Sequence, residues 1–368
     1  MKSAFFRKPL FILIGILSGV LVIEITLRAV DYEGLSLMKK HPILGQVYKP
    51  HLQTTVYSEE AREFVPIRIN SLGFRDREHV PGAVSGKRVV ILGDSFVAAF
   101  SVNFKETFPQ LCEEYLNRQS PEDWEVINLG VAGFGTAQEM LSYQEYGRKY
   151  RPDVVVLAFF PGNDVSDNSS ELSSNPRVYY TVDAGGKLIR ERAGELRSNL
   201  SSLLNEYSRF YVWQKTQMKK LEHYYRYRIV LNPSYRVFLS QDDPKTLRAW
   251  EITRALLKQL ADDVKRDHAQ LLVLYIPFPD AIYPDWWRET LQSSPPMQEE
   301  KWDPGKPEQI IAAFCKENNI SFLSPGKTFA EDTSRRYYFR HGHLNESGHR
   351  TTAELLGEWI LRVSSESR

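Results

Sequence analysis

Three short runs of aliphatic and β-branched residues, each followed by a glycine, restrict the fold of this chain more than any other feature. The runs begin at residues 88, 124 and 153, and the glycines that follow them are residues 93, 130 and 162. Apolar runs of this length without polar alternation are typical of strands buried on both faces of a parallel sheet. Helical patterns over residues 108–117 and 136–150 separate the runs. This alternation predicts an α/β fold with right-handed crossovers.

The same alternation of helices and strands returns in the C-terminal part of the chain. Helices are predicted over residues 244–268, 307–318 and 347–363, and strands over residues 271–277 and 320–323. Because these two strands follow the same pattern, they are expected to join the first three. The sequence therefore predicts a mostly parallel sheet of about five strands.

Two segments fall outside this pattern. Residues 31–87 are predicted to form an irregular lead-in with one hairpin, and residues 165–245 an insertion with a hairpin near 178–190. A helix over residues 196–228 of the insertion is rich in aromatic and basic residues. We expect its aromatic side chains to pack on the protein itself, with the charges in solvent. The alternatives are a surface that stacks on sugars or one that lies on a membrane.

The N-terminus carries a candidate membrane segment over residues 1–30. Lys2, Arg7 and Lys8 precede an uncharged apolar stretch over residues 9–23. Continued to residue 30 it is long enough to span a bilayer, with Glu24 and Arg28 near its far end. Because positive charges stay on the cytoplasmic side, we predict a single-pass signal-anchor with an extracytoplasmic body, periplasmic or on the outer side. The alternatives are a signal peptide, with secretion after cleavage, and a buried helix of a soluble protein.

Composition excludes several classes of protein. The chain has 47 Lys and Arg residues against 46 Asp and Glu residues, so it lacks the basic excess of a nucleic-acid binder. Cys112 and Cys315 are the only cysteines, too few for a disulfide framework or a cysteine-rich zinc site. They form either one disulfide or two free thiols.

Polar residues that can carry out acyl transfer follow the predicted strands. Ligands of an α/β sheet bind outside the carboxyl ends of the strands, where Ser95, Gly133 and Asn163 are expected. The Ser95 hydroxyl needs a base to become a nucleophile, and His343 before the last helix is the candidate. The candidate oxyanion donors are the Ser95 and Gly133 N–H groups and the Asn163 amide. Asp94 is a candidate supporting residue.

The histidines near the last helix also permit a metal site. His341, His343 and His349 lie close in the sequence, but Glu346 is the only acidic residue among them. Metal sites usually recruit further acidic or cysteine ligands. We therefore predict no metal and no cofactor.

These residues resemble the sequence blocks of the SGNH hydrolases, also called GDSL-type lipases or acylhydrolases. The blocks correspond to Gly93-Asp94-Ser95-Phe96, Gly133, Gly162-Asn163-Asp164 and His343, in the family's order. The resemblance implies a three-layer α/β/α sandwich and a catalytic domain over residues 88–363, interrupted by the insertion. It also implies cleavage or transfer of acyl groups through an acyl-serine.

The sequence departs from the family at the acid that orients the histidine. The family's aspartate stands three residues before the histidine, or two in some relatives, and those positions are Arg340 and His341. Three outcomes remain open: a Ser–His dyad held by a backbone carbonyl, another acid such as Glu331 or Asp332, or reduced or lost activity.

The sequence as a whole predicts a membrane-anchored serine esterase. Its substrates would be acyl esters, acetyl esters among them, on an extracytoplasmic carbohydrate or lipid. One alternative is a polysaccharide O-acyltransferase with the same Ser95 and His343. The other is a catalytically degenerate SGNH scaffold in an envelope assembly.

Overall fold

The computed structural model divides into two compact units. One unit comprises residues 1–37 and 194–229, and the other comprises residues 38–193 and 230–368. The residues that the structure describes are 2–29, 37–82, 84–173, 177–183, 185–191, 204, 207–226, 230–340 and 342–366.

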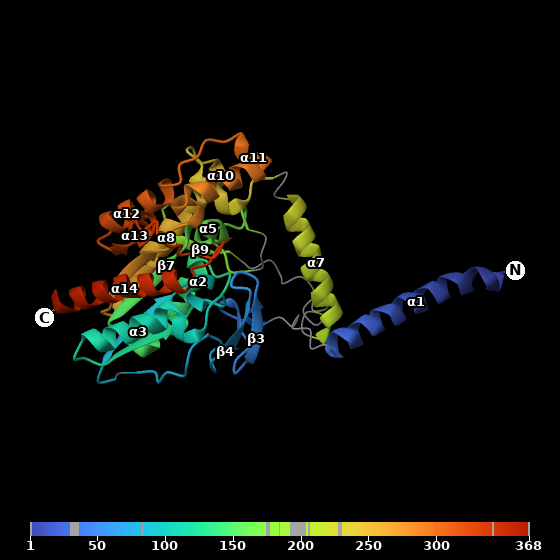
Figure 1. Ribbon diagram of the computed structural model, residues 1–368, viewed down its shortest axis with the longest axis horizontal. Coiled ribbons are helices and arrows are strands. Elements are labelled where there is room, and N and C mark those ends of the chain that lie inside the picture. The colour runs from blue at the N-terminus through green and yellow to red at the C-terminus, as the bar shows by residue number, and fades with distance from the viewer. Residues whose placement is uncertain are drawn as a thin grey trace. The chain divides into compact units, whose positions relative to one another are not determined.

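A five-stranded parallel sheet forms the centre of the larger unit (Figure 1). Its strands stand in the order β11-β10-β7-β5-β6, and this confirms the predicted α/β fold. The order reverses between β5 and β7, where neighbouring crossovers leave on opposite faces. Ligands of α/β sheets bind at the carboxyl ends of the strands beside such a switch point. The strands are β5 (Lys87–Leu92), β6 (Trp124–Asn128), β7 (Val154–Phe159), β10 (Gln270–Tyr275) and β11 (Ser321–Leu323).

Helices cover both faces of the sheet and complete the three-layer sandwich. Helices α3 (Phe108–Gln119) and α14 (Glu346–Glu366) pack side by side and share one apolar core with the sheet (Figure 1). Helices α4 (Thr136–Glu145) and α8 (Pro244–Arg266) pack against each other. Right-handed crossovers place them on the opposite face. The shorter helices of this unit are α2 (Ser95–Ala98), α5 (Pro161–Asp164), α9 (Pro279–Ile282), α10 (Pro284–Ser293), α11 (Pro295–Gln298), α12 (Lys306–Glu317) and α13 (Gly326–Glu331).

The segment before the sheet is more regular than expected. It contains two antiparallel hairpins, β1 (Met38–His41) with β2 (Gly45–Tyr48) and β3 (Gln53–Ser58) with β4 (Glu63–Arg68). Val65 in β4 is buried while its neighbours Phe64 and Pro66 are exposed, which is the alternation of a strand with one buried face. The insertion contains the expected hairpin as β8 (Tyr180–Val182) and β9 (Leu188–Arg190).

The two cysteines are both free. Cys112 lies in α3 and Cys315 in α12, and both are buried. They therefore contribute to the core as small apolar side chains.

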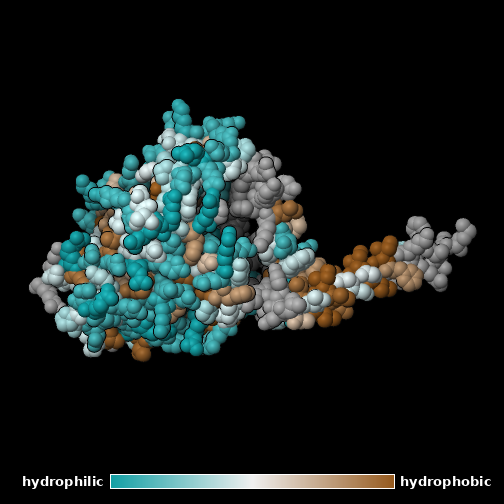
Figure 2. All heavy atoms as spheres, in the orientation of Figure 1, coloured by the Kyte–Doolittle hydropathy of each residue, from teal (hydrophilic) through white to brown (hydrophobic). Residues whose placement is uncertain are grey.

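Two long helices account for most of the described residues of the smaller unit. They are α1 (Lys2–Ala29) and α7 (Arg209–Arg226). Residues Phe11–Ala29 of α1 are long and apolar enough to cross a membrane (Figure 2). Of the predicted insertion helix, residues 196–203, 205–206 and 227–228 lie outside the described residues.

Arg75 holds the chain that follows α2. Its guanidinium is buried and donates to the carbonyl oxygens of Ala98, Ala99 and Val102. Replacing Arg75 by methionine leaves these buried acceptors without donors, so we expect the free energy of unfolding to fall by about 3 kcal/mol. Urea unfolding of the full chain in detergent measures this loss. The exposed Arg68→Met is the control, and equal stability of the two variants would refute the assignment.

Candidate active site

The turn between β5 and α2 presents Ser95 at the carboxyl end of the sheet. Asp94 is the N-cap of α2, and its Oδ1 accepts the Phe96 N–H at 2.8 Å. The absence of a side chain on Gly93 allows this sharp turn, because a Cβ there would lie 2.3 Å from the Val97 Cγ2. Ser95 is the first residue of the helix and is partly exposed.

The structure brings Ser95 and His343 together. The Ser95 Oγ lies 2.8 Å from the His343 Nε2, although the two residues are far apart in the sequence. The histidine stands in a loop closed by the Phe339 N–H, which donates to the His343 carbonyl at 2.9 Å. The Phe96 ring packs on the imidazole with ring centroids 4.9 Å apart. The pair therefore has the contact that proton transfer from a serine hydroxyl requires.

A carboxylate on the β3–β4 hairpin completes the arrangement. Glu60 lies in the turn between the two strands, and its Oε1 is 2.7 Å from the His343 Nδ1. Its Oε2 accepts the Ser101 hydroxyl at 2.7 Å. Ser58 steadies the turn, because its Oγ accepts the Ala61 N–H at 3.1 Å. Glu60 thus favours the tautomer with the proton on Nδ1, which leaves Nε2 free to accept the Ser95 proton.

The acids proposed from the sequence near His343 lie elsewhere. Asp332 accepts the Tyr337 hydroxyl at 2.7 Å, and Glu331 lies 3.8 Å from the Lys327 ammonium. Neither of them contacts His343, so this part of the prediction is wrong.

The position three residues before the histidine does not supply an acid either. Arg340 pairs with Glu289, and His341 lies outside the described residues. Glu60 was missed because its contact joins residues 283 positions apart, whereas the prediction considered acids close to His343 in the chain. The available signal was an acidic pair, Glu59-Glu60, in the turn of the hairpin expected before the sheet.

The candidate oxyanion donors surround the same turn. Gly133 has a φ of +79°, a left-handed conformation that favours glycine. Within the described part of the chain, no protein acceptor receives the N–H of Ser95 or of Gly133. The Asn163 Nδ2 donates to the Asp94 Oδ2 at 2.7 Å and to the Phe134 carbonyl at 3.2 Å. An oxyanion would therefore have to replace the longer of these two bonds.

The charges around the pair favour a protonated imidazole. Removal from water lowers the pKa of His343, but the hydrogen bond and charge of Glu60 and the charge of Asp94 together raise it above 6.5. Burial raises the pKa of Asp94 to about 6, although the Phe96 N–H and the His343 charge act in the opposite direction. A positive imidazole formed during the reaction is thus stabilised by two neighbouring acids.

Two further buried acids lie behind Asp94. Burial and the nearby charge of Asp94 raise the pKa of Glu139 well above its ordinary value. Burial and the charges of Glu139 and Asp94 do the same for Asp164. Each of these carboxyls is therefore easier to protonate than a carboxyl in water.

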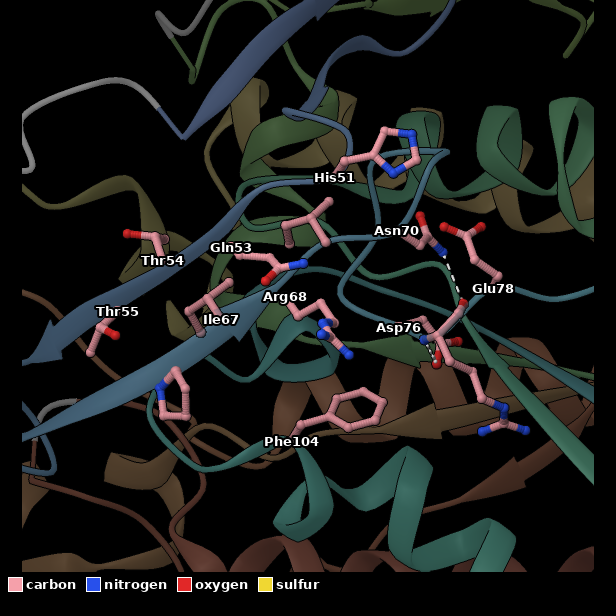
Figure 3. A pocket seen from close by; sticks show the side chains of 13 residues that line it. His51, Gln53, Thr54, Thr55, Ile67, Arg68, Asn70, Asp76, Glu78 and Phe104 are labelled. Carbon is pink, nitrogen blue, oxygen red and sulfur yellow. Dashed lines mark hydrogen bonds between the residues drawn. The ribbon is translucent and has the colours of Figure 1, made fainter.

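The β3–β4 hairpin also borders a hollow of about 810 Å³ (Figure 3). Its lining includes Gln53, Ile67, Arg68 and Phe104, and it contains neither Ser95 nor His343. The hollow is thus distinct from the pair, although the hairpin that carries Glu60 forms one of its walls.

The comparison with protein families identifies the chain. The sequence profile of the GDSL-like Lipase/Acylhydrolase family matches residues 91–351, which include Ser95, Gly133, Asn163 and His343. The chain belongs to this family. It is an SGNH serine hydrolase that acts on ester bonds. Glu60 precedes the matched region, so this hydrolase has the carboxylate beside its histidine outside the family's shared segment.

The chain is similar to several solved structures of lipases and esterases. A GDSL-like lipase from Bacteroides thetaiotaomicron is 12% identical, with 77% of this chain and 93% of that chain covered and a TM-score of 0.41. A lipase/acylhydrolase from Enterococcus faecalis is 12% identical, with 74% and 95% covered and a TM-score of 0.40. The acetyl xylan esterase AlAXEase is 14% identical, with 74% and 98% covered and a TM-score of 0.39. No curated protein sequence matches the chain.

Proposed function

We propose that this SGNH hydrolase cleaves acyl esters with Ser95 as nucleophile, His343 as general base and Glu60 as the residue that positions the imidazole. One observation carries the proposal. The Ser95 Oγ, both ring nitrogens of His343 and the Glu60 Oε1 form a continuous chain with distances of 2.8 and 2.7 Å. The alternative of a degenerate scaffold depended on the lack of a carboxylate beside His343. The contact of Glu60 with the His343 Nδ1 argues against that alternative.

The proposed reaction has two halves. The Ser95 Oγ attacks the ester carbonyl carbon while its proton moves to the His343 Nε2, and Glu60 holds the Nδ1–H throughout. The tetrahedral oxyanion accepts hydrogen bonds from the Ser95 N–H, the Gly133 N–H and the Asn163 amide. When the intermediate collapses, the alcohol leaves with the proton from Nε2. Water then attacks the acyl-serine through the same base and releases the acid.

The proposed substrates are acyl esters, acetyl esters among them, of a carbohydrate or lipid at the cell envelope. The apolar segment Phe11–Ala29 supports a location at a membrane. The basic residues Lys2, Arg7 and Lys8 before it support an extracytoplasmic body.

Hydrolysis of an ester series tests this proposal. We expect the purified full chain to hydrolyse p-nitrophenyl acetate, butyrate and octanoate, and acetylated xylan to compete with them. A second assay follows acetyl transfer to an added glycan in competition with water. Free acetate as the main product supports a hydrolase, acetylated glycan indicates a transferase, and no turnover of any ester by folded protein contradicts the proposal.

The pH dependence of the reaction follows from the pKa of His343. Because the protonated imidazole cannot accept the Ser95 proton, kcat/KM is expected to fall on the acid side, with a midpoint above pH 6.5. Glu60→Gln removes the charge that raises this pKa, while removal from water still lowers it. The midpoint should therefore move to lower pH. A pH–rate profile of both proteins measures the shift, and an unchanged midpoint would contradict the contact.

A further inference from the structure

A charged residue within the apolar helix α1 has partners in the insertion. The Glu24 carboxylate accepts the Ser208 hydroxyl at 3.1 Å, the Arg209 N–H at 3.2 Å and the Phe210 N–H at 2.8 Å. It also pairs with Arg28 of the same helix at 2.7 Å. An ionisable residue in a membrane segment is costly without partners, and α7 supplies them here.

Glu24 caps the start of α7 from another helix of the same chain. The first N–H groups of a helix have no partner within it, and α7 begins at Arg209. The Glu24 carboxylate satisfies two of these donors and favours the positive end of the helix dipole. One turn further along α1, the Arg28 guanidinium donates to the Tyr207 carbonyl at 2.6 Å. The start of α7 is therefore fixed to residues 24–28 of α1.

The position of this contact along α1 sets its depth. The apolar span Phe11–Ala29 has 19 residues, which is about 28 Å of helix and close to the thickness of a bilayer's hydrocarbon core. Glu24 lies near the C-terminal end of the span. Tyr207, which is 62% exposed, and Phe210 contact Arg28 and Glu24 through their backbones, so both stand at this end of the span. The Trp213 ring stacks on the Phe210 ring with centroids 6.1 Å apart. Aromatic residues gather at this depth in membrane proteins.

We propose that α1 is retained in the mature protein and that α7 lies along the membrane surface against anionic phospholipid headgroups. Signal cleavage after α1 would remove both Glu24 and Arg28 and leave the start of α7 uncapped. The sequence of α7 contains five basic residues and one acidic residue, which suits an anionic surface. Met218 and Leu221, 58% and 51% exposed, offer apolar contacts to the lipid boundary.

The first experiment determines the N-terminus of the mature protein. The full chain is expressed with its own N-terminus, extracted from membranes and analysed by intact mass and N-terminal sequencing. We expect residues 2–29 to be present. A mature chain that begins after Ala29 would overturn it.

The second experiment measures the depth of Trp213. The full chain is reconstituted in vesicles of phosphatidylethanolamine and phosphatidylglycerol, with and without lipids brominated near the headgroup. Bromolipid is expected to quench the wild type more strongly than Trp213→Phe, and equal quenching would overturn a membrane-surface position for α7. A difference that vanishes in vesicles of neutral lipid supports the role of anionic headgroups.

A matched pair of variants tests the cap itself. Glu24→Ala removes the acceptor, whereas Thr26→Ala changes a side chain that bonds the Val22 carbonyl of its own helix. The Arg209 and Phe210 amides should exchange with deuterium about tenfold faster in Glu24→Ala and at the wild-type rate in Thr26→Ala. Equal rates in both variants would overturn the cap. These measurements do not use ester hydrolysis, so their outcome is separate from that of the proposed function.

Discussion

Replacing Ser95 by alanine is expected to lower kcat for ester hydrolysis by about 10⁵- to 10⁶-fold. The variant keeps the backbone N–H groups of position 95 and Gly133 but loses the side-chain oxygen that forms the acyl-enzyme. Because the proposed mechanism uses Ser95 and His343, 2.8 Å apart, as one unit, His343→Ala should cost about as much, and the double variant little more. Steady-state hydrolysis of p-nitrophenyl acetate measures each loss.

A serine outside the site provides the control for this prediction. Ser120 follows α3, and its Oγ accepts the Glu122 N–H at 3.1 Å. Ser120→Ala should keep the wild-type rate. A Ser95→Ala variant that is folded and still hydrolyses the ester within tenfold of wild type would place the nucleophile elsewhere.

Replacing Glu60 by glutamine is expected to lower kcat about 10³- to 10⁴-fold, with a much smaller change in KM. Glutamine has nearly the same shape but lacks the charge that stabilises the imidazolium. Its amide can also donate to Nδ1 and so favour the tautomer with the proton on Nε2, which cannot accept from Ser95. Glu60→Asp keeps the charge and should recover part of the loss.

Glu63→Gln is the matched control for the hairpin. It removes the same charge from the start of β4, where Glu63 is exposed. Its kcat should equal that of the wild type. If Glu60→Gln matched this control, His343 would be positioned by another group.

In the proposed mechanism, activity depends on Glu60 and thus on an element outside the family's shared segment. The β3–β4 sheet has two strands, and such a hairpin is marginally stable alone. The Glu60 contacts with Ser101 and His343 therefore both place the carboxylate and hold the hairpin to the catalytic domain.

Much of the fold could be predicted from the sequence because local patterns determine it. The buried strands such as β5 and β7 are continuous apolar runs, and the turn at Asp94 and Ser95 follows directly from the end of one of them. Parallel strands end at the same edge, so the meeting of Ser95 with the loop of His343 followed from topology.

The remaining features depend on contacts between distant segments. Glu60 joins His343 through a hairpin whose docking no local pattern specifies. Similarly, Glu24 is an isolated charge near the end of an apolar segment in the sequence. Its partners at the start of α7 are visible only in the structure. The Asn163 amide was predicted as a donor, but its bond to Asp94 depends on how two loops approach each other.

Covalent labelling tests the central claim most directly. The full chain in detergent is treated with a fluorophosphonate at pH 8, digested and analysed by mass spectrometry, beside Ser95→Ala, Glu60→Gln and Glu63→Gln. We predict a single adduct on Ser95 in the wild type and in Glu63→Gln, much slower labelling of Glu60→Gln, and none of Ser95→Ala. An adduct on another residue, or equal labelling rates in Glu60→Gln and Glu63→Gln, would contradict it.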